Sequence, residues 1–176
     1  VNLTGGGEVV MGNHASNRII GAGGGSLVNV DNIIHGAGQI CANTMDMTNQ
    51  AELIADQPSP LTIDPAATFT NAGTLAAQGG GTLRLSGGLY ANETGLIESR
   101  AGSLVELSSA TISGGTLQAV DDGAFRVIAT SSLNGDVSPV SIGCAVEMLN
   151  SIDIILRGSI LNSGSLNLSA GGSFTD

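Results

Sequence analysis

The chain has 176 residues and a net charge of −10, from 15 acidic residues and five arginines, without any lysine. Its length corresponds to a single domain, and the arginines are spread singly, which disfavours binding to nucleic acid or to an anionic membrane. With 27 glycines, 2% aromatic and 11% charged residues, the composition indicates a folded chain with a narrow interior. No apolar run approaches the roughly 18 residues of a membrane-spanning helix.

The first 40 residues predict short strands separated by glycine-rich corners. Residues 1–11 and 19–30 each contain three consecutive glycines, a polar loop over 12–18 separates them, and Asn32 leads a further corner. His14 and His35 lie 21 positions apart. The local motif spacing is 18, and no carboxylate accompanies the pair, so we expect exposed or turn histidines and no metal site.

The next segment is irregular. Within 42–51, Met45 and Met47 alternate as if both face an interior. The sequence DQPSP at 56–60 contains two prolines, which exclude a regular strand. We therefore expect a protruding loop there.

From residue 61 to 127 the chain repeats with a period of about 21 residues, most clearly around NAGTLAAQGGGTLRL at 71–85. Two columns of glycines recur, Gly73, Gly95 and Gly115 in one and Gly81, Gly102 and Gly123 in the other. Two apolar columns keep the same step: Leu53, Leu75, Ile97 and Leu117 form the first, and Leu61, Leu83, Leu104 and Phe125 the second.

This period predicts an all-β parallel β-helix with about 21 residues per coil and roughly eight coils, because it leaves no room for a helix with its loops. Alternation along a strand points Leu83 and Leu85 into the lumen and Arg84 to solvent. Three copies begin with an asparagine, and stacked asparagines can bond to one another through their amides. The members of this column are Asn49, Asn71 and Asn92. We expect one β-helix domain over 1–176, as part of a longer repeat protein.

The last third departs from the repeat. Asp121, Asp122 and Gly123 predict a tight turn, and they match no calcium-binding repeat. Residues 133–141 drift from the pattern, and the apolar stretch 142–156 is either a buried strand pair or a short helix. Residues 160–174 return to the pattern.

The two cysteines, Cys41 and Cys144, are 103 positions apart. In coils of about 21 residues they lie about five coils, or more than roughly 20 Å, from each other. That separation excludes a disulfide between them, so both are expected to be buried free thiols.

The phrases GGGSLVNVDNIIHGAGQI, TNAGTLAAQGGGTLRLSGG and ETGLIESRAGSLVELSSATISGGTL resemble the repeats of filamentous-haemagglutinin-like and autotransporter-like bacterial surface adhesins. The resemblance covers most of the chain. It implies a right-handed coil, secretion or exposure at the cell surface, and a place in the stalk of a larger protein. The chain contains no integrin-binding Arg-Gly-Asp tripeptide.

We therefore expect a non-catalytic structural or adhesive module with no catalytic, cofactor-binding or metal-binding residues. The expected partners are a host or environmental polysaccharide or surface, and further copies contacting through the ends of the solenoid. Nucleic acid and membrane insertion are not expected.

Two other functions stay open. A polysaccharide-degrading β-helix needs converging carboxylates, for which Glu98, Glu106, Asp121 and Asp122 are the candidates. Glu98 and Arg100 share a strand face and can simply pair with neighbours on the rod surface. An ice-binding solenoid needs a regular face of stacked threonines. The hydroxyl residues of the repeat fall in two columns and mix serine with threonine: Ser26, Thr74, Thr82, Ser103 and Thr116.

Overall fold

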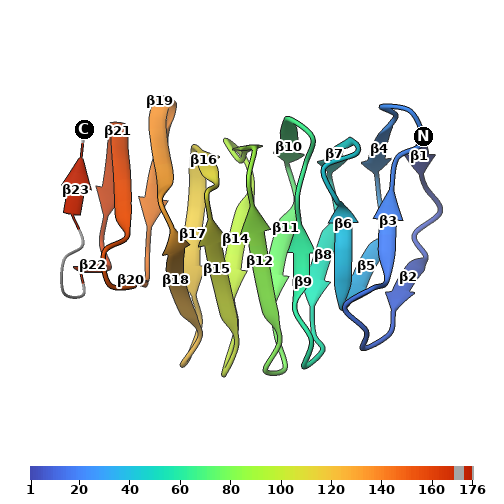
Figure 1. Ribbon diagram of the computed structural model, residues 1–176, viewed down its shortest axis with the longest axis horizontal. Coiled ribbons are helices and arrows are strands. Elements are labelled where there is room, and N and C mark those ends of the chain that lie inside the picture. The colour runs from blue at the N-terminus through green and yellow to red at the C-terminus, as the bar shows by residue number, and fades with distance from the viewer. Residues whose placement is uncertain (169–172, 176) are drawn as a thin grey trace.

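The computed structural model describes residues 1–168 and 173–175, and within them the chain is all-β without any helix. Strands cross the long axis of the molecule and stack along it as a parallel β-solenoid, with the two termini at opposite ends (Figure 1). No helix in the described residues is long and apolar enough to cross a membrane.

Three lines of parallel strands run along the rod. The first contains β1 (Asn2–Leu3), β4 (Ser26–Asn29), β7 (Asp46–Asn49), β10 (Thr68–Asn71), β13 (Leu89–Ala91), β16 (Thr111–Ser113) and β23 (Ser173–Thr175). The second contains β2 (Glu8–Met11), β5 (Ile33–Gly36), β8 (Glu52–Ala55), β11 (Thr74–Ala77), β14 (Leu96–Ser99) and β17 (Gly115–Ala119). Two long strands, β19 (Ser131–Ile142) and β21 (Asp153–Asn162), belong to both lines and join them into one 15-stranded sheet.

The third line is a separate sheet of eight strands. It contains β3 (Arg18–Ile20), β6 (Gly38–Cys41), β9 (Leu61–Ile63), β12 (Thr82–Ser86), β15 (Leu104–Ser108), β18 (Ala124–Ala129), β20 (Ala145–Met148) and β22 (Ser165–Leu168). One strand from each line makes a coil, except that β19 and β21 each serve as both the first-line and the second-line strand of their coils.

The first predicted apolar column is confirmed, since Leu53 pairs with Leu75, Leu75 with Ile97, and Ile97 with Leu117. The second is wrong at one position: Leu83 pairs with Val105, and Leu104 pairs with Thr82. The coil between these strands is 22 residues long, one more than the assumed step. The same extra residue corrects the second glycine column, because Ser103, not Gly102, precedes Leu104 at the position of Gly81.

The lumen is filled by the inward residues of all three lines. Leu83 and Leu85 are fully buried and Arg84 is not, as predicted, and Met45 and Met47 are also buried. Each fully buried leucine contributes about 2 kcal/mol of transfer free energy. Phe69 and Tyr90 occupy successive coils with ring centroids 5.8 Å apart. Phe125, the other fully buried ring, instead lies between Val105 and Val146 of the neighbouring strands.

A buried asparagine ladder marks the corner between the first and second lines. The side-chain amide of Asn49 donates to the amide oxygen of Asn71 at 3.0 Å, and Asn71 donates to Asn92 at 2.8 Å. The ladder begins one coil earlier than predicted, with Asn29 donating to Asn49 at 2.9 Å. Asn32 does not stand in this column; its backbone N–H donates to Asn29.

The first glycine column has a steric cause. A Cβ at Gly73, Gly95 or Gly115 would overlap a backbone carbonyl of the preceding coil. The carbonyls concerned belong to Ala51, Asn71 and Asn92. Glycine is therefore required at these three positions, where the corner of one coil lies directly on the next.

The irregular segments form part of the solenoid. The stretch 142–156 contains strand residues of β19, β20 and β21, which excludes the helical alternative, and 133–141 lies within β19. The 56–60 loop does not protrude freely, because the N–H of Ser59 donates to the Asn13 side chain at 2.9 Å. Strand β22 returns to the repeat as predicted, whereas residues 169–172 of that prediction lie outside the described residues.

Candidate functional site

The densest polar cluster lies on the outer surface of the second line, where β14 ends and the chain turns towards β15. We call Glu52, Gln78, Glu98 and Arg100 the Arg100 cluster. The Arg100 guanidinium donates to Glu98 at 2.6 Å and to Gln78 at 2.7 Å, and it lies 3.9 Å from Glu52. Glu98 itself is only 8% exposed.

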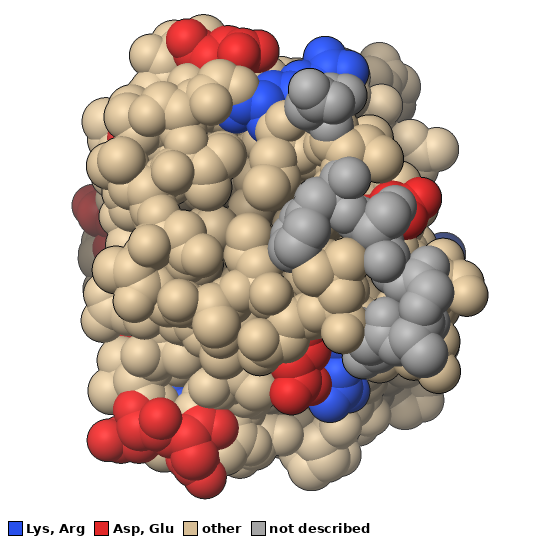
Figure 2. Space-filling view, turned by 90° about the vertical axis from the view of Figure 1, so that its left-hand side faces the viewer, with Lys and Arg blue, Asp and Glu red and all other residues tan. Residues whose placement is uncertain are grey.

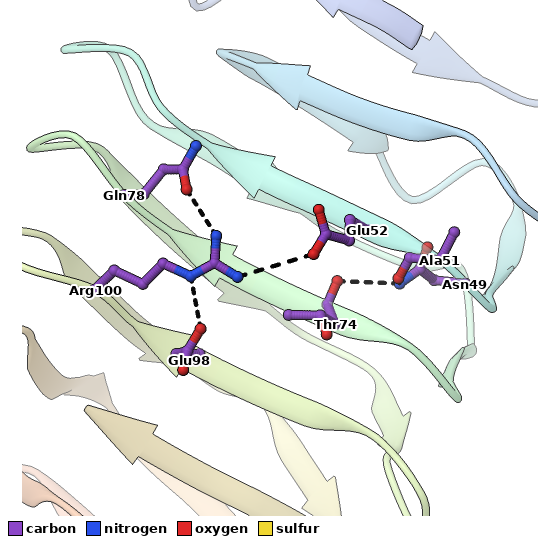
Figure 3. Close-up of polar contacts among 7 residues, drawn as sticks. All are labelled: Asn49, Ala51, Glu52, Thr74, Gln78, Glu98 and Arg100. Atoms are coloured by element: carbon purple, nitrogen blue, oxygen red, sulfur yellow. Dashed lines mark hydrogen bonds and ion pairs between the residues drawn. The ribbon is translucent and has the colours of Figure 1, made fainter. Parts of the chain in front are cut away.

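The residues of this cluster come from three successive coils. Glu52 lies on β8, Gln78 follows β11, and Glu98 and Arg100 belong to the coil of β14. Figure 3 shows Arg100 reaching across the strands towards Gln78 and Glu52. Its donors are directed at acceptors of its own surface, so the cluster ties coils together along the rod axis. The sequence predicted that Glu98 and Arg100 pair with neighbours on the rod surface, and Arg100 does so with Gln78 and Glu52, besides bonding Glu98 itself.

A second row of charges follows the outer surface of the third line. Register places Arg84, Glu106, Arg126 and Glu147 on four successive strands, and we call this row the charge ladder. Arg84 donates to Glu106 through Nε at 2.9 Å and Nη2 at 2.8 Å. The Arg126–Glu147 distance is longer, 3.8 Å. Opposite charges on neighbouring strands stabilise the stack modestly.

The two histidines behave differently. His14 is exposed in a loop, and its Nδ1 accepts the N–H of Ser16, as expected of a turn histidine. His35 corrects the prediction, because it lies on β5, half-buried, with Nδ1 2.8 Å from Asp56. The two do not align, since His35 pairs with Val10 on the preceding strand. No group of three metal-ligating side chains is found within the described residues.

The four carboxylates considered for glycosidic cleavage do not converge. Glu98 lies on the second line and Glu106 on the third, and each is bound by an arginine of its own surface. Asp121 and Asp122 form the predicted tight turn between β17 and β18, where Gly123 N–H donates to the Val120 carbonyl at 3.1 Å. There Asp122 accepts the N–H of Gly102 at 2.7 Å. These side chains support corners and strand pairs.

Three buried groups, the thiols of Cys41 and Cys144 and the hydroxyl of Tyr90, are held in their neutral forms. Burial, with smaller effects from nearby Asp46 and Asp64, raises the pKa of Cys41 to about 12, and burial raises that of Cys144 to about 11. Both cysteines are free and buried, as predicted. Burial also raises the pKa of Tyr90, whose hydroxyl lies 2.7 Å from the Ile63 carbonyl. None of them has the activated form that nucleophilic catalysis requires.

The hydroxyl residues of the repeat do not form one stacked column. Thr74 is separated from Thr116 by Leu96, and Thr82 pairs with Leu104. Ser26 lies on the first line, in β4. Buried Ser103 accepts the N–H of Gly80 at 3.0 Å, which is the corner-capping role expected of it. These residues therefore do not make the regular face that ice binding needs.

Comparison with known proteins adds no family: no family model matches the chain, and neither a curated protein nor a solved structure matches it significantly.

Proposed function

We propose that this chain is a non-catalytic structural or adhesive module of a secreted or cell-surface bacterial protein. The observation that supports it best is the arrangement of the outward polar side chains. In both the Arg100 cluster and the charge ladder they bond to neighbouring coils along the axis. Such side chains stiffen a rod.

The adhesive version of the proposal places binding on the second line. The Arg100 cluster and the nearby His35–Asp56 pair present hydrogen-bonding groups from successive coils on one side of the rod. The hydroxyl groups of an extended polysaccharide lying along the axis would complement them. The acidic character of the whole chain favours a neutral or cationic polymer.

The test is incubation of the purified chain with a panel of immobilised polysaccharides, following retention of the protein and release of new reducing ends. The adhesive version predicts retention without new ends. Arg100→Gln should weaken retention at least threefold, whereas Arg84→Gln, on the third line, should leave it unchanged. Equal loss in both variants would contradict binding on the second line.

Release of new reducing ends would overturn the non-catalytic proposal. Absence of both retention and cleavage would contradict adhesion and leave the structural role, in which the module is a spacer. That role has its own readout: small-angle scattering should give a rigid rod on the order of 40 Å long, from about eight coils spaced 4.8 Å apart. A compact or flexible particle would contradict it.

A further inference from the structure

The charge ladder on the third line has bonding groups that the chain itself does not use. Arg84 bonds Glu106 through Nε and Nη2, and both bonds end on the same carboxylate oxygen, Oε2. Within the described residues, the other Glu106 oxygen and the Arg126 guanidinium form no hydrogen bond, and Arg126 Nε is buried without an acceptor. Arg126 lies 3.8 Å from Glu147. These groups can therefore bond to a partner outside the chain.

The ladder is the most prominent feature of its face. The side chains of Arg84, Arg126 and Glu147 are each more than a third exposed. Short or uncharged side chains flank the ladder on both sides, in register with its members. On one side they are Thr82, Leu104, Ala124 and Ala145, and on the other Ser86, Ser108 and Ala129. A flat partner can therefore reach the charges without steric obstruction.

The third line is also the side of the rod on which two copies repel each other least. Its strands hold three arginines and two glutamates, a net charge of +1, whereas the chain as a whole carries −10. The strands of the other two lines are net negative. Figure 2 views the rod along its axis and shows charged side chains around the rim. Contact between copies through the third line keeps most of the acidic groups apart.

The order of charges along the ladder complements itself when it is reversed. From β12 to β20 the charges alternate in sign, on strands spaced about 4.8 Å apart. If a second copy faces the first with its rod axis reversed, Arg84 lies opposite Glu147, and Glu106 lies opposite Arg126. If the two rods point the same way at the same level, each charge meets its own equivalent, and like charges repel.

From this arrangement we propose that two copies of the chain associate side by side and antiparallel, through the outer faces of their third lines. The two-fold axis runs parallel to the strands, midway between β15 and β18. It generates two Arg84–Glu147 pairs and two Glu106–Arg126 pairs between the copies. Because both copies use the same surface, the contact closes at two and leaves the second line of each copy free.

The residues beside and beyond the ladder fit the same axis. It places Leu104 on Ala124 of the second copy, an apolar contact next to the central charges. One strand further out on each side, it places Thr62 opposite Asn167 of the second copy, and these two can share a hydrogen bond. Six strands then face six, over a length of about 24 Å. A contact of this size between solvated side chains is weak, so dilute chain is monomeric.

Sedimentation equilibrium of the 176-residue chain, up to a concentration of about 1 mM, tests the proposal. At about 0.1 M salt, charges more than about 10 Å apart are largely screened, and the wild type should form dimers as its concentration rises. At about 1 M salt the screening length falls to about 3 Å, and the dissociation constant should rise at least tenfold. A wild-type chain that stays monomeric throughout would overturn the proposal and leave the ladder as an intrachain brace.

Exchange of charges tests the pairing itself. Arg84→Glu and Glu147→Arg each set like charges opposite one another twice in a dimer of identical chains, so each should weaken self-association at least tenfold. Their equimolar mixture should dimerise as the wild type does, because each variant supplies the charge that the substituted position of the other requires. A mixture that associates no better than the separate variants would overturn the antiparallel pairing.

Two matched controls change the net charge by the same amounts on other faces. Arg157→Glu lies on the first line and Glu8→Arg on the second, both at exposed positions, and both should dimerise as the wild type does. Weakening equal to that of the ladder variants would show that net charge governs association, and would overturn the proposal. Circular dichroism checks that each variant is folded. Recovery in the mixture separates contact between copies from lost pairing within a chain.

Discussion

The corner between the first and second strand lines is built in two ways along the rod. From β4 to β14 each coil turns at a buried asparagine, and the two lines are separate strands: Asn29, Asn49, Asn71 and Asn92 occupy this column. Towards the C-terminus the same column continues as Gly114, Gly135 and Gly158, and in β19 and β21 the two lines merge into strands of 12 and 10 residues.

The difference between the asparagine corners and the glycine corners shows how the asparagine side chain ends a strand. Its amide bonds backbone carbonyls at the corner, as Asn71 does with those of Gly73 and Leu96, and so competes with strand pairing and ends the strand. Glycine offers no such competitor. At Gly158, φ is 62°, a bend that an amino acid with a side chain rarely adopts. The chain therefore turns there without leaving the sheet.

The largest expected effect comes from placing a charge in the lumen of the asparagine-containing coils. Leu83→Asp puts a carboxylate in a fully buried position without a partner, which destabilises by several kcal/mol. We expect local unfolding of the middle coils and a lower melting temperature. Leu166→Asp, at a half-buried position in the last coil, should lower it much less. Unchanged melting of Leu83→Asp would contradict the lumen register.

The next effect concerns the ladder itself. Asn71→Ala removes a buried donor and acceptor at once, leaving the amides of Asn49 and Asn92 short of a partner, at an expected cost of about 2–4 kcal/mol. Asn134→Ala is the control. Asn134 is half-buried, and its amide oxygen accepts only the local N–H of Asp136. Chemical denaturation should therefore show a lower free energy of unfolding for Asn71→Ala and an unchanged one for Asn134→Ala. Equal losses in the two variants would contradict a stabilising role of the ladder.

The reactivities of the two thiols compare the asparagine-containing coils, which include Cys41, with the C-terminal coils, which include Cys144. Both raised pKa values leave the thiols protonated at pH 8, so neither reacts readily with a disulfide reagent in the folded chain. Cys144, with the lower pKa of about 11 and 6% exposure, should react before fully buried Cys41. Mass spectrometry of the labelled peptides gives the order. Faster labelling of Cys41 would show that the early coils open more easily.

The smallest effect is expected at the corner that follows β9. Burial raises the pKa of Asp64, so its folded form binds protons more tightly than the unfolded form. The stability linked to this proton is present at low pH and is lost as pH rises through the folded pKa. Asp64→Asn should therefore raise the melting temperature by about 1 °C at pH 7 and leave it unchanged at pH 3. A rise of equal size at both pH values would contradict the assigned cause.

The sequence predicted the features that repeat locally. The first apolar column is confirmed, with Leu53, Leu75, Ile97 and Leu117 stacked on one another. The first glycine column marks the corner at which a Cβ would clash with the preceding coil. Leu104 was misplaced because the prediction stepped 21 residues from Leu83 where the coil has 22, as the coils before it do, and a one-residue error moves a strand residue to the other side of the sheet.

Most polar pairs on the outer surface could not be predicted from the sequence. Surface pairing was expected for Glu98 and Arg100 without named partners, and the two are close enough in sequence to bond each other, whereas Arg84 and Glu106 pair only because of the coil register. His35 and Asp56 are 21 residues apart, and Asp56 lies in a loop that the prolines suggested was protruding. Spacing alone did not reveal that this loop folds back on the strands.

The central claim is that the asparagine ladder couples the coils it passes through. Hydrogen exchange of Asn71→Ala, compared with the wild type peptide by peptide, tests it most directly. We expect faster exchange in β7, β10 and β13, the coils on either side of residue 71, and unchanged protection in β20 and β22. Faster exchange confined to β10, or spread evenly over the whole rod, would contradict the coupling through the ladder.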